Sequence, residues 1–241
     1  TFCESVAGIA VGALGPDCLS SSDICKLRRA EFYIHLDQFE DALNLLNSAL
    51  RINDQLHEAY WMKSKIYQEL GEIDNWLSSL QTAIEVNPNF FDGFIALGIA
   101  YSNMGDDIAI EYYRSAITIN PASVEAKYNL AMHYQETLRL DAAKALYEEI
   151  LSIDSMNATA AFNLGFINIE FVQDYSQAEL WFGEAINKLP YYHQAFYYRG
   201  LARESQDNLS DALDDYNEAL RLKPDYTDAA IAKGRVLDSQ K

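Results

Sequence analysis

The sequence predicts an all-α protein built from six copies of one helix-turn-helix unit. The first observation is a column of small residues at spacings of 34, 33, 34, 35 and 34: Ala49, Ala83, Ala116, Ile150, Ala185 and Ala219. Three more columns keep this period: Ala42, Trp76, Ala109, Ala143, Ala178 and Ala212; Ala30, Ser64, Gly98, Ala131, Gly165 and Gly200; and Leu46, Leu80, Tyr113, Tyr147, Phe182 and Tyr216. A fixed period of this length indicates a repeat architecture.

Each predicted unit contains two amphipathic helices. Apolar residues recur at spacings of three and four, as in Leu43, Leu46 and Leu50, which is the pattern of a helix with one buried face. Prolines near the unit ends separate successive helices, because proline disrupts a helix interior; they are Pro88, Pro121, Pro190 and Pro224. The units run over 23–56, 57–90, 91–123, 124–157, 158–192 and 193–226, followed by a polar C-terminal capping helix over 227–241.

Two units differ in length. Gly98 and Ala109 are one residue closer than the usual twelve, and Gly165 and Ala178 are one residue further apart. Both changes fall where a turn is expected between the two helices. Trp76 replaces the alanine of its column, so the second hairpin must open locally or turn this ring outward.

The N-terminal segment, residues 1–22, allows two interpretations. Its apolar stretch Val6–Gly15 is about half as long as a membrane helix requires. We expect either a helix that caps the first repeat or the remnant of a processed targeting segment. A Cys3–Cys18 bridge stays open, and so does the compartment: the cytoplasm is favoured, with the periplasm or cell envelope as the alternative.

Composition narrows the classes of partner. The 241 residues carry 36 acidic and 18 basic side chains, a formal charge of -18. Nucleic acids and anionic lipids require a basic surface, so we expect neither as a ligand. The expected partner is a protein or peptide, no direct membrane insertion is expected, and a homo-oligomer is left open.

These columns and segments such as residues 196–224 (FYYRGLARESQDNLSDALDDYNEALRLKP) resemble tetratricopeptide repeats over residues 23–241. The resemblance implies a right-handed superhelix whose first helices line a concave groove, and a non-catalytic binding scaffold. Some positions depart from the family pattern: Arg29, Lys63 and Arg199 replace leucine, and Asn168 and Arg203 replace tyrosine. These departures leave local packing open.

Family geometry places a line of large side chains on the groove: Leu27, Trp61, Ile95, Tyr128, Phe162 and Tyr197. They either pack against the neighbouring helix or remain open as anchors for a partner. Asn129 and Asn163 occupy the next position, where an amide could pair with a peptide backbone or only contact water. Groove acids, among them Glu125, Glu136 and Glu170, favour a basic or neutral peptide, unless they form only a solvated surface.

No catalytic motif stands out, so we expect neither an enzyme nor a cofactor or metal. The histidines His35, His57, His133 and His193 lie in different units without ligand spacing. The adjacent acids Glu148 and Glu149, and Asp214 and Asp215, are interpreted as solvated faces, because neighbours on a helix diverge by about 100 degrees. The predicted function is a scaffold that holds an extended or helical peptide. The alternatives are the substrate-recognition array of a larger enzyme and a self-assembling structural subunit.

Overall fold

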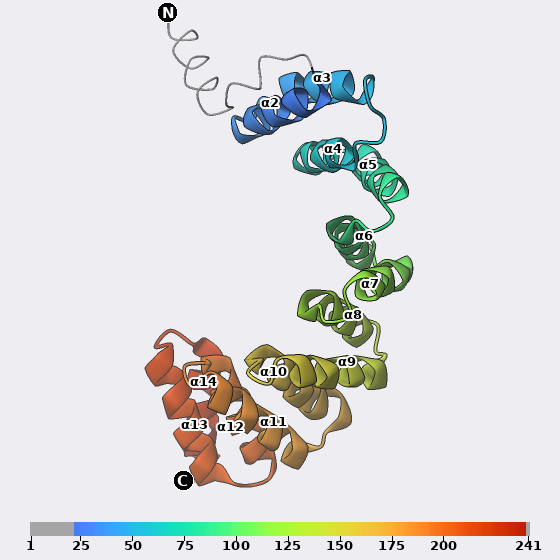
Figure 1. Cartoon of the computed structure of the whole chain (residues 1–241). Coiled ribbons are helices and arrows are strands. Elements are labelled where there is room, and N and C mark those ends of the chain that lie inside the picture. Colours follow the sequence, from blue (N-terminus) through green and yellow to red (C-terminus); the bar gives the residue numbers. More distant parts are fainter. Residues whose placement is uncertain (1–21, 240–241) are drawn as a thin grey trace, which may run out of the picture. The chain divides into compact units, whose positions relative to one another are not determined.

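The computed structural model describes residues 22–239. Over this range the chain forms thirteen α-helices and one π-helical turn, without a strand (Figure 1). The all-α helical-hairpin fold is therefore confirmed, whereas the number of repeats stays a prediction. The expectations for Val6–Gly15 and for a Cys3–Cys18 bridge lie outside the described residues. Cys25 is buried in the helix Asp23–His35.

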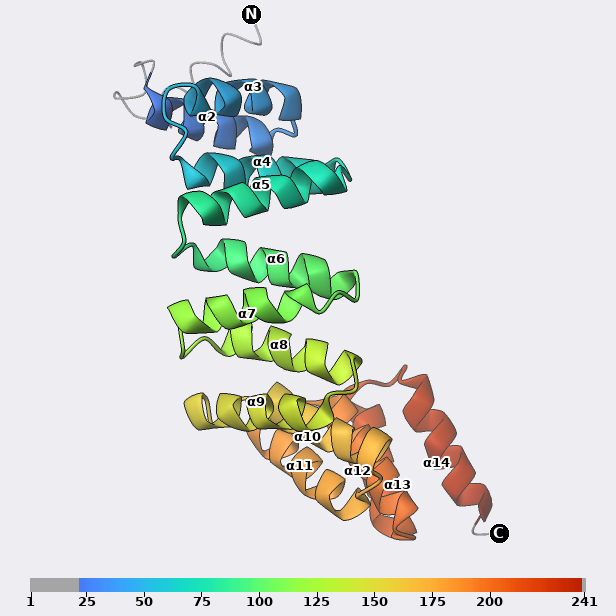
Figure 2. The ribbon, with the colours of Figure 1, turned by 90° about the vertical axis from the view of Figure 1, so that its right-hand side faces the viewer.

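The helices fall into two compact units, residues 1–120 and 121–241. The first contains α2 (Asp23–His35), α3 (Phe39–Leu50), α4 (His57–Glu69), α5 (Ile73–Val86), α6 (Phe91–Asn103) and α7 (Ile108–Ile119). The second contains α8 (Val124–Glu136), α9 (Leu140–Ile153), α10 (Ala158–Ile167), η2 (Asn168–Val172), α11 (Tyr175–Lys188), α12 (His193–Ser205), α13 (Leu209–Leu222) and α14 (Thr227–Ser239). Figure 2 shows the two helices of a hairpin lying side by side, as in α4 and α5.

Side-chain caps mark where several helices begin, and residues with positive φ follow the end of the first helix of each hairpin. The side chains of Ser123, Asn157 and Asp174 each accept a hydrogen bond from the backbone N–H three residues later, at 2.9 to 3.1 Å, which satisfies a donor that the first turn leaves free. Every hairpin turn contains one residue in the left-handed region: Asp37, Gly71, Gly105, Leu138, Gln173 and Asp207. This conformation commonly follows the last turn of a helix.

The small-residue columns lie where paired helices approach most closely. A Cβ atom added to Gly165 would lie 2.8 Å from Cε1 of Phe182, and one added to Gly200 would lie 2.6 Å from Cε1 of Tyr216. The alanines of the other columns are fully buried, as Ala178 and Ala212 illustrate. An aromatic ring of the second helix therefore packs directly on the backbone of the first.

The two length changes are absorbed differently. The extra residue before Ala178 is taken up by the π-helical turn Asn168–Val172, since such a turn is how a helix accommodates an insertion. The Asn168 side chain is buried there: its Nδ2 donates to the Leu164 carbonyl at 2.8 Å, and Lys144 Nζ donates to its Oδ1 at 3.0 Å. The missing residue before Ala109 shortens the first turn of α7, which begins at Ile108.

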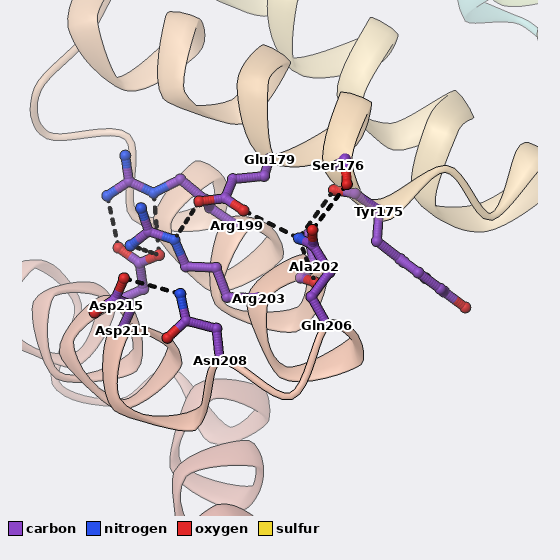
Figure 3. Close-up of polar contacts among 10 residues, drawn as sticks. All are labelled: Tyr175, Ser176, Glu179, Arg199, Ala202, Arg203, Gln206, Asn208, Asp211 and Asp215. Carbon is purple, nitrogen blue, oxygen red and sulfur yellow. Dashed lines mark hydrogen bonds and ion pairs between the residues drawn. The ribbon is translucent and has the colours of Figure 1, made fainter.

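Three charged departures from the family pattern, Lys63, Arg199 and Arg203, have hydrogen-bond partners. Figure 3 shows Arg199 and Arg203 of α12 converging on Asp215 of α13. Arg199 donates two hydrogen bonds to this carboxylate, at 3.0 and 2.6 Å, and Arg203 donates one at 3.0 Å. Arg203 Nε also donates to Glu179 of α11 at 2.8 Å, so three helices are joined. In the first unit, Lys63 Nζ donates to Asn47 Oδ1 at 3.1 Å.

One sequence interpretation is wrong here. Asp214 is exposed, as expected, but Asp215 is only 3% exposed. Its burial is tolerated because two guanidinium groups compensate its charge. The other anomaly, Trp76, is half-buried, whereas the alanines of its column are fully buried.

Replacing Gly165 with alanine should lower the free energy of unfolding by about 1 to 3 kcal/mol, because the new methyl group overlaps the Phe182 ring. Gly183 on the facing helix provides the matched control, since its nearest side-chain atom would be 3.9 Å away. Gly183→Ala should stabilise by about 0.5 to 1 kcal/mol through helix propensity. Urea unfolding measures both variants, and equal effects would contradict the packing described.

Asp215→Asn should destabilise by about 3 kcal/mol, because it leaves two partly buried arginines without their shared counter-charge. Asp214→Asn, one position away on the exposed side, should change stability by less than about 0.5 kcal/mol. Thermal unfolding of the two variants tests this difference. A neutral effect of Asp215→Asn would show that the ion pairs do not stabilise the fold.

Candidate functional site

Six half-buried aromatic side chains form one connected cluster in the unit of residues 121–241, and Tyr128 lies beside this cluster, close enough to Tyr192 to help burial raise the pKa of that phenol. The aromatic surface consists of these side chains: Tyr128, Phe162, Phe166, Tyr192, Tyr197, Tyr198 and Tyr226. Phe162 lies at its centre, with ring centroids 5.0 Å from Tyr192, 5.5 Å from Tyr198 and 6.4 Å from Phe166. The cluster joins the predicted anchors Phe162 and Tyr197 through a ring that lies between them.

The rings are held in place by contacts below and beside them. Phe162 and Tyr198 both touch Phe182, which is fully buried in α11. Tyr197 lies 5.1 Å from Tyr198 and 5.2 Å from Tyr226, which precedes α14. Tyr128 lies 6.1 Å from the buried Tyr147. Tilted, stacked and edge-to-face packing together hold each ring, so little conformational entropy is lost if a ligand binds them.

Acidic side chains border the aromatic surface. Glu170, in the π-helical turn, and Asp228, at the start of α14, are exposed, and the negative charge of each helps to raise the pKa of Tyr197 and Tyr198. Burial is the main cause of that rise. Phe171, next to Glu170, is 40% exposed and lies against Phe166. The π-helical turn thus contributes both an acid and an apolar ring to the border.

The other predicted charge selectors, Glu125 and Glu136, are exposed on α8. Glu136 is close enough to Tyr147 for its charge to raise the pKa of that phenol, although burial has the larger effect. The structure therefore leaves all three predicted acids accessible. Their role in selecting a ligand stays a prediction.

The two predicted asparagine clamps differ in environment. Asn129 is half-buried, whereas Asn163 is 8% exposed. The Asn163 Nδ2 donates a long hydrogen bond of 3.5 Å to the Tyr128 hydroxyl and lies 3.9 Å from Met132 Sδ. Asn163 thus connects α10 with α8 inside the protein, so Asn129 is the more accessible of the two amides.

The predicted anchors in residues 1–120 differ in their exposure. Trp61 is half-buried, with its ring 5.3 Å from Phe90 and with Lys65 Nζ 4.7 Å from its centroid. Ile95 is 6% exposed, so little of it is available to a ligand. Leu27 is similarly buried.

Several members of the aromatic surface were missed by the sequence analysis. Tyr192 and Tyr226 end their units, as Phe90 does, so the aromatic residue at this position in three of the six units could have been found by its spacing. Phe166 and Tyr198 do not occupy the anchor position. They join the surface because helices α10 and α12 bring their rings to 5.5 Å, which no spacing within one helix reveals.

A hollow of about 560 Å³ lies between α11 and α12, lined in part by Leu180, Gly183, Arg199 and Arg203. Its two arginines already bind Asp215 and Glu179 (Figure 3). Their charges are therefore compensated within the protein, and the hollow is not organised to bind an anion. Through these ion pairs Arg203 joins α11 to α13, and Arg199 strengthens the contact of α12 with α13.

Two further features are absent from residues 22–239. No helix in this range combines the length and apolar character needed to cross a bilayer. The same range contains no group of three or more histidine, cysteine or acidic side chains arranged to hold a metal ion. The candidate site consists of the aromatic rings, amides and carboxylates given above.

Comparison with known proteins identifies the family. Tetratricopeptide repeat family profiles match residues 57–90, 92–123, 124–155 and 193–226, and the chain belongs to this family. Tetratricopeptide repeat protein 6 of Homo sapiens is 22% identical over 174 residues, which cover 70% of this chain and 33% of that protein. The peroxisomal targeting signal receptor of Candida glabrata is 28% identical over 144 residues, or 59% of this chain and 23% of the receptor.

A solved structure shows the same fold. The C-terminal part of a TPR repeat-containing protein from Cytophaga hutchinsonii superposes with a TM-score of 0.78 at 17% identity, covering 88% of each chain. This chain spans a third or less of the length of its curated relatives, tetratricopeptide repeat protein 6 and the peroxisomal targeting signal receptor. Tetratricopeptide repeat proteins are generally protein-interaction scaffolds rather than enzymes, and they bind protein or peptide partners.

The alkaline stability of the protein should depend on Tyr192. Burial, assisted by the nearby Tyr128, raises the pKa of Tyr192 from 10.0 to about 12. The unfolded chain loses this proton near pH 10 while the folded chain keeps it, so its contribution to stability is present below pH 10 and is lost between pH 10 and 12. Urea unfolding should show a steeper loss of stability over this window in the wild type than in Tyr192→Phe. Parallel pH profiles would contradict the prediction.

Proposed function

We propose that residues 121–241 bind a peptide segment of a protein partner on the aromatic surface, and that this segment carries basic and apolar side chains. The segment is extended or helical. The observation that carries the proposal is the connected cluster of six half-buried rings, with Tyr128 beside it and exposed carboxylates at its border. Binding without catalysis is the expected activity.

The rings supply the apolar part of the binding energy. Aromatic anchors contribute a large share of the energy of protein interfaces, particularly where they are rigid and partly desolvated. Phe162, Tyr197 and Tyr198 meet both conditions, since each is half-buried and contacts at least two other rings. An apolar side chain of the partner would cover their exposed edges.

The carboxylates and the ring faces together favour a cation. A lysine or arginine over an aromatic face gains about 0.5 to 2 kcal/mol, depending on how far it is desolvated. Glu170 and Asp228 lie close enough to Tyr197 and Tyr198 to affect their pKa, so a cation placed over these rings would also meet negative charge. The protein's charge of -18 adds long-range attraction in the same direction.

The asparagine amides and the anchors in residues 1–120 would contribute less to binding than the aromatic surface. Asn129, beside Tyr128 on α8, can donate to and accept from a peptide backbone. Asn163 would act mainly by fixing Tyr128. Trp61 is the accessible anchor in residues 1–120, and Ile95 would contribute only at its edge. One relative of the chain is a peroxisomal targeting signal receptor, which agrees with peptide binding.

Charge reversal tests the proposal without disturbing the packed rings. Two fluorescent peptides of equal apolar content, one rich in lysine and one rich in glutamate, are titrated with the protein by anisotropy. Wild type should prefer the lysine peptide, and Glu170→Lys combined with Asp228→Lys should weaken its binding about tenfold or more. Glu148→Lys with Asp141→Lys is the matched control, since both residues are exposed on α9.

The control variant should retain most of the affinity, apart from a modest long-range effect that salt screens. Circular dichroism verifies that both double variants remain helical. Equal affinity of wild type for the two peptides, or equal losses in the two variants, would show that the aromatic surface does not select a basic ligand.

A further inference from the structure

The turns of the first three hairpins share an apolar pattern. The residue that caps the C-terminal end of each first helix is large and apolar, and so is the residue that begins each second helix: Leu36 and Phe39, Leu70 and Ile73, and Met104 and Ile108. Phe39 is half-buried, and the other five are 44 to 53% exposed. Single exposed apolar residues are normal on a protein surface, but these recur at the same two positions in three successive hairpins.

The fold does not require apolar residues at the helix caps. In residues 121–241 the caps of α8 and α12 are Thr137 and Gln206, and both helices form hairpins. Figure 2 shows the α4–α5 and α6–α7 turns at one edge of the first unit and the connections between hairpins at the opposite edge. Stacked hairpins cover one another's faces, so further hairpins at either end of the array would leave these turns open.

Trp76 lies beside the exposed residues of the second turn. It follows Ile73 by three residues, so the two side chains are neighbours on one face of α5. Ala42 and Ala109, at the equivalent positions, are fully buried, whereas Trp76 is half-buried. Part of the indole is therefore at the surface. Tryptophan is one of the residue types most enriched among the side chains that dominate interface energies.

The turns also carry charge of one sign. Segments 36–41, 69–74 and 104–111 each contain three acids and no lysine or arginine: Asp37, Glu40 and Asp41; Glu69, Glu72 and Asp74; and Asp106, Asp107 and Glu111. All of these acids except Asp106 are exposed. Exposed apolar side chains bordered by carboxylates favour a ligand that is apolar and basic, and they repel an anionic one.

We propose that these turns dock a basic amphipathic helix of a protein partner. The docking surface, named the turn edge, consists of Leu36, Leu70, Ile73, Trp76, Met104 and Ile108 with the acids around them. The apolar stripe of the partner helix covers the apolar side chains, and lysine or arginine residues on either side of the stripe meet the acids. The turn edge lies within residues 22–120, so it is a second site, independent of the aromatic surface.

Charge distinguishes this partner from other occupants. A second copy of the chain, docked edge to edge, would bring like charges together. Residues 1–21 contain Glu4 and Asp17 but no lysine or arginine, so their sequence does not supply the complementary charge. Anionic lipid would be repelled by the same carboxylates.

The probe is a peptide of about 18 leucine and lysine residues, or five helical turns, with the leucines on one face. A side-chain staple holds it helical, because short isolated helices are marginal in water. The full chain carries 5-fluorotryptophan, and single tryptophan-to-phenylalanine variants assign the fluorine signals of Trp61, Trp76 and Trp181. Titration should shift the Trp76 signal until the site is saturated. Trp181 packs on the core under the aromatic surface and reports binding there.

Paired variants test whether the apolar side chains of the turn edge bind the peptide. Leu70→Ser combined with Ile73→Ser should raise the Kd reported by Trp76 about tenfold or more, because apolar contacts next to the indole are lost. The matched control is Ile24→Ser combined with Ile52→Ser, which are 58 and 57% exposed at the other ends of α2 and α3. The control should stay within about twofold. All four positions are exposed, so both variants should melt close to wild type.

Four results would overturn the proposal. The first two are absence of peptide binding and saturable binding that leaves the Trp76 signal in place. The third is an equal loss of affinity in the two double variants, and the fourth is equal binding of a peptide with glutamate in place of lysine. Movement of Trp181 without Trp76 would place the peptide on residues 121–241, so this proposal would fail while the function proposed above would stand.

Discussion

Three hairpins of the structure depend on close contact between an aromatic ring of one helix and the backbone of its partner helix. At Gly98, Gly165 and Gly200 the ring lies where a Cβ would otherwise be, so the hairpin spacing leaves no room for a side chain. In these three hairpins the contact fixes how the first helix lies on the second. It thereby determines which side chains of α10 and α12 remain half-buried at the surface.

The aromatic surface is a consequence of that packing. Phe182, which packs on Gly165, also supports Phe162 and Tyr198 from below. The rings that could meet a ligand are therefore held by rings that hold the fold together. Because the rings of the surface pack on rings that stabilise the fold, the surface is rigid. Substituting a central ring would also disturb folding, so the exposed acids at the border are better targets for testing binding.

The sequence predicted the hairpins well because close helix contacts leave small residues at a fixed period. It could not predict the burial of Asp215, since Arg199 lies sixteen residues away on another helix and nothing in the local pattern reveals their pairing. It likewise treated Asn129 and Asn163 as equivalent, although the Asn163 amide is turned toward Tyr128 and Met132. The π-helical turn at Asn168–Val172 was visible only as an extra residue, without its conformation.

The central claim is that the half-buried rings of residues 121–241 contact the partner. The most direct measurement is nuclear magnetic resonance of the full chain with ring-labelled tyrosine, titrated with the lysine-rich peptide. The account predicts shifts of Tyr197, Tyr198 and Tyr226, while Tyr113, which is 2% exposed in the other unit, remains unchanged. Saturable binding that leaves the signals of those three tyrosines in place would contradict it.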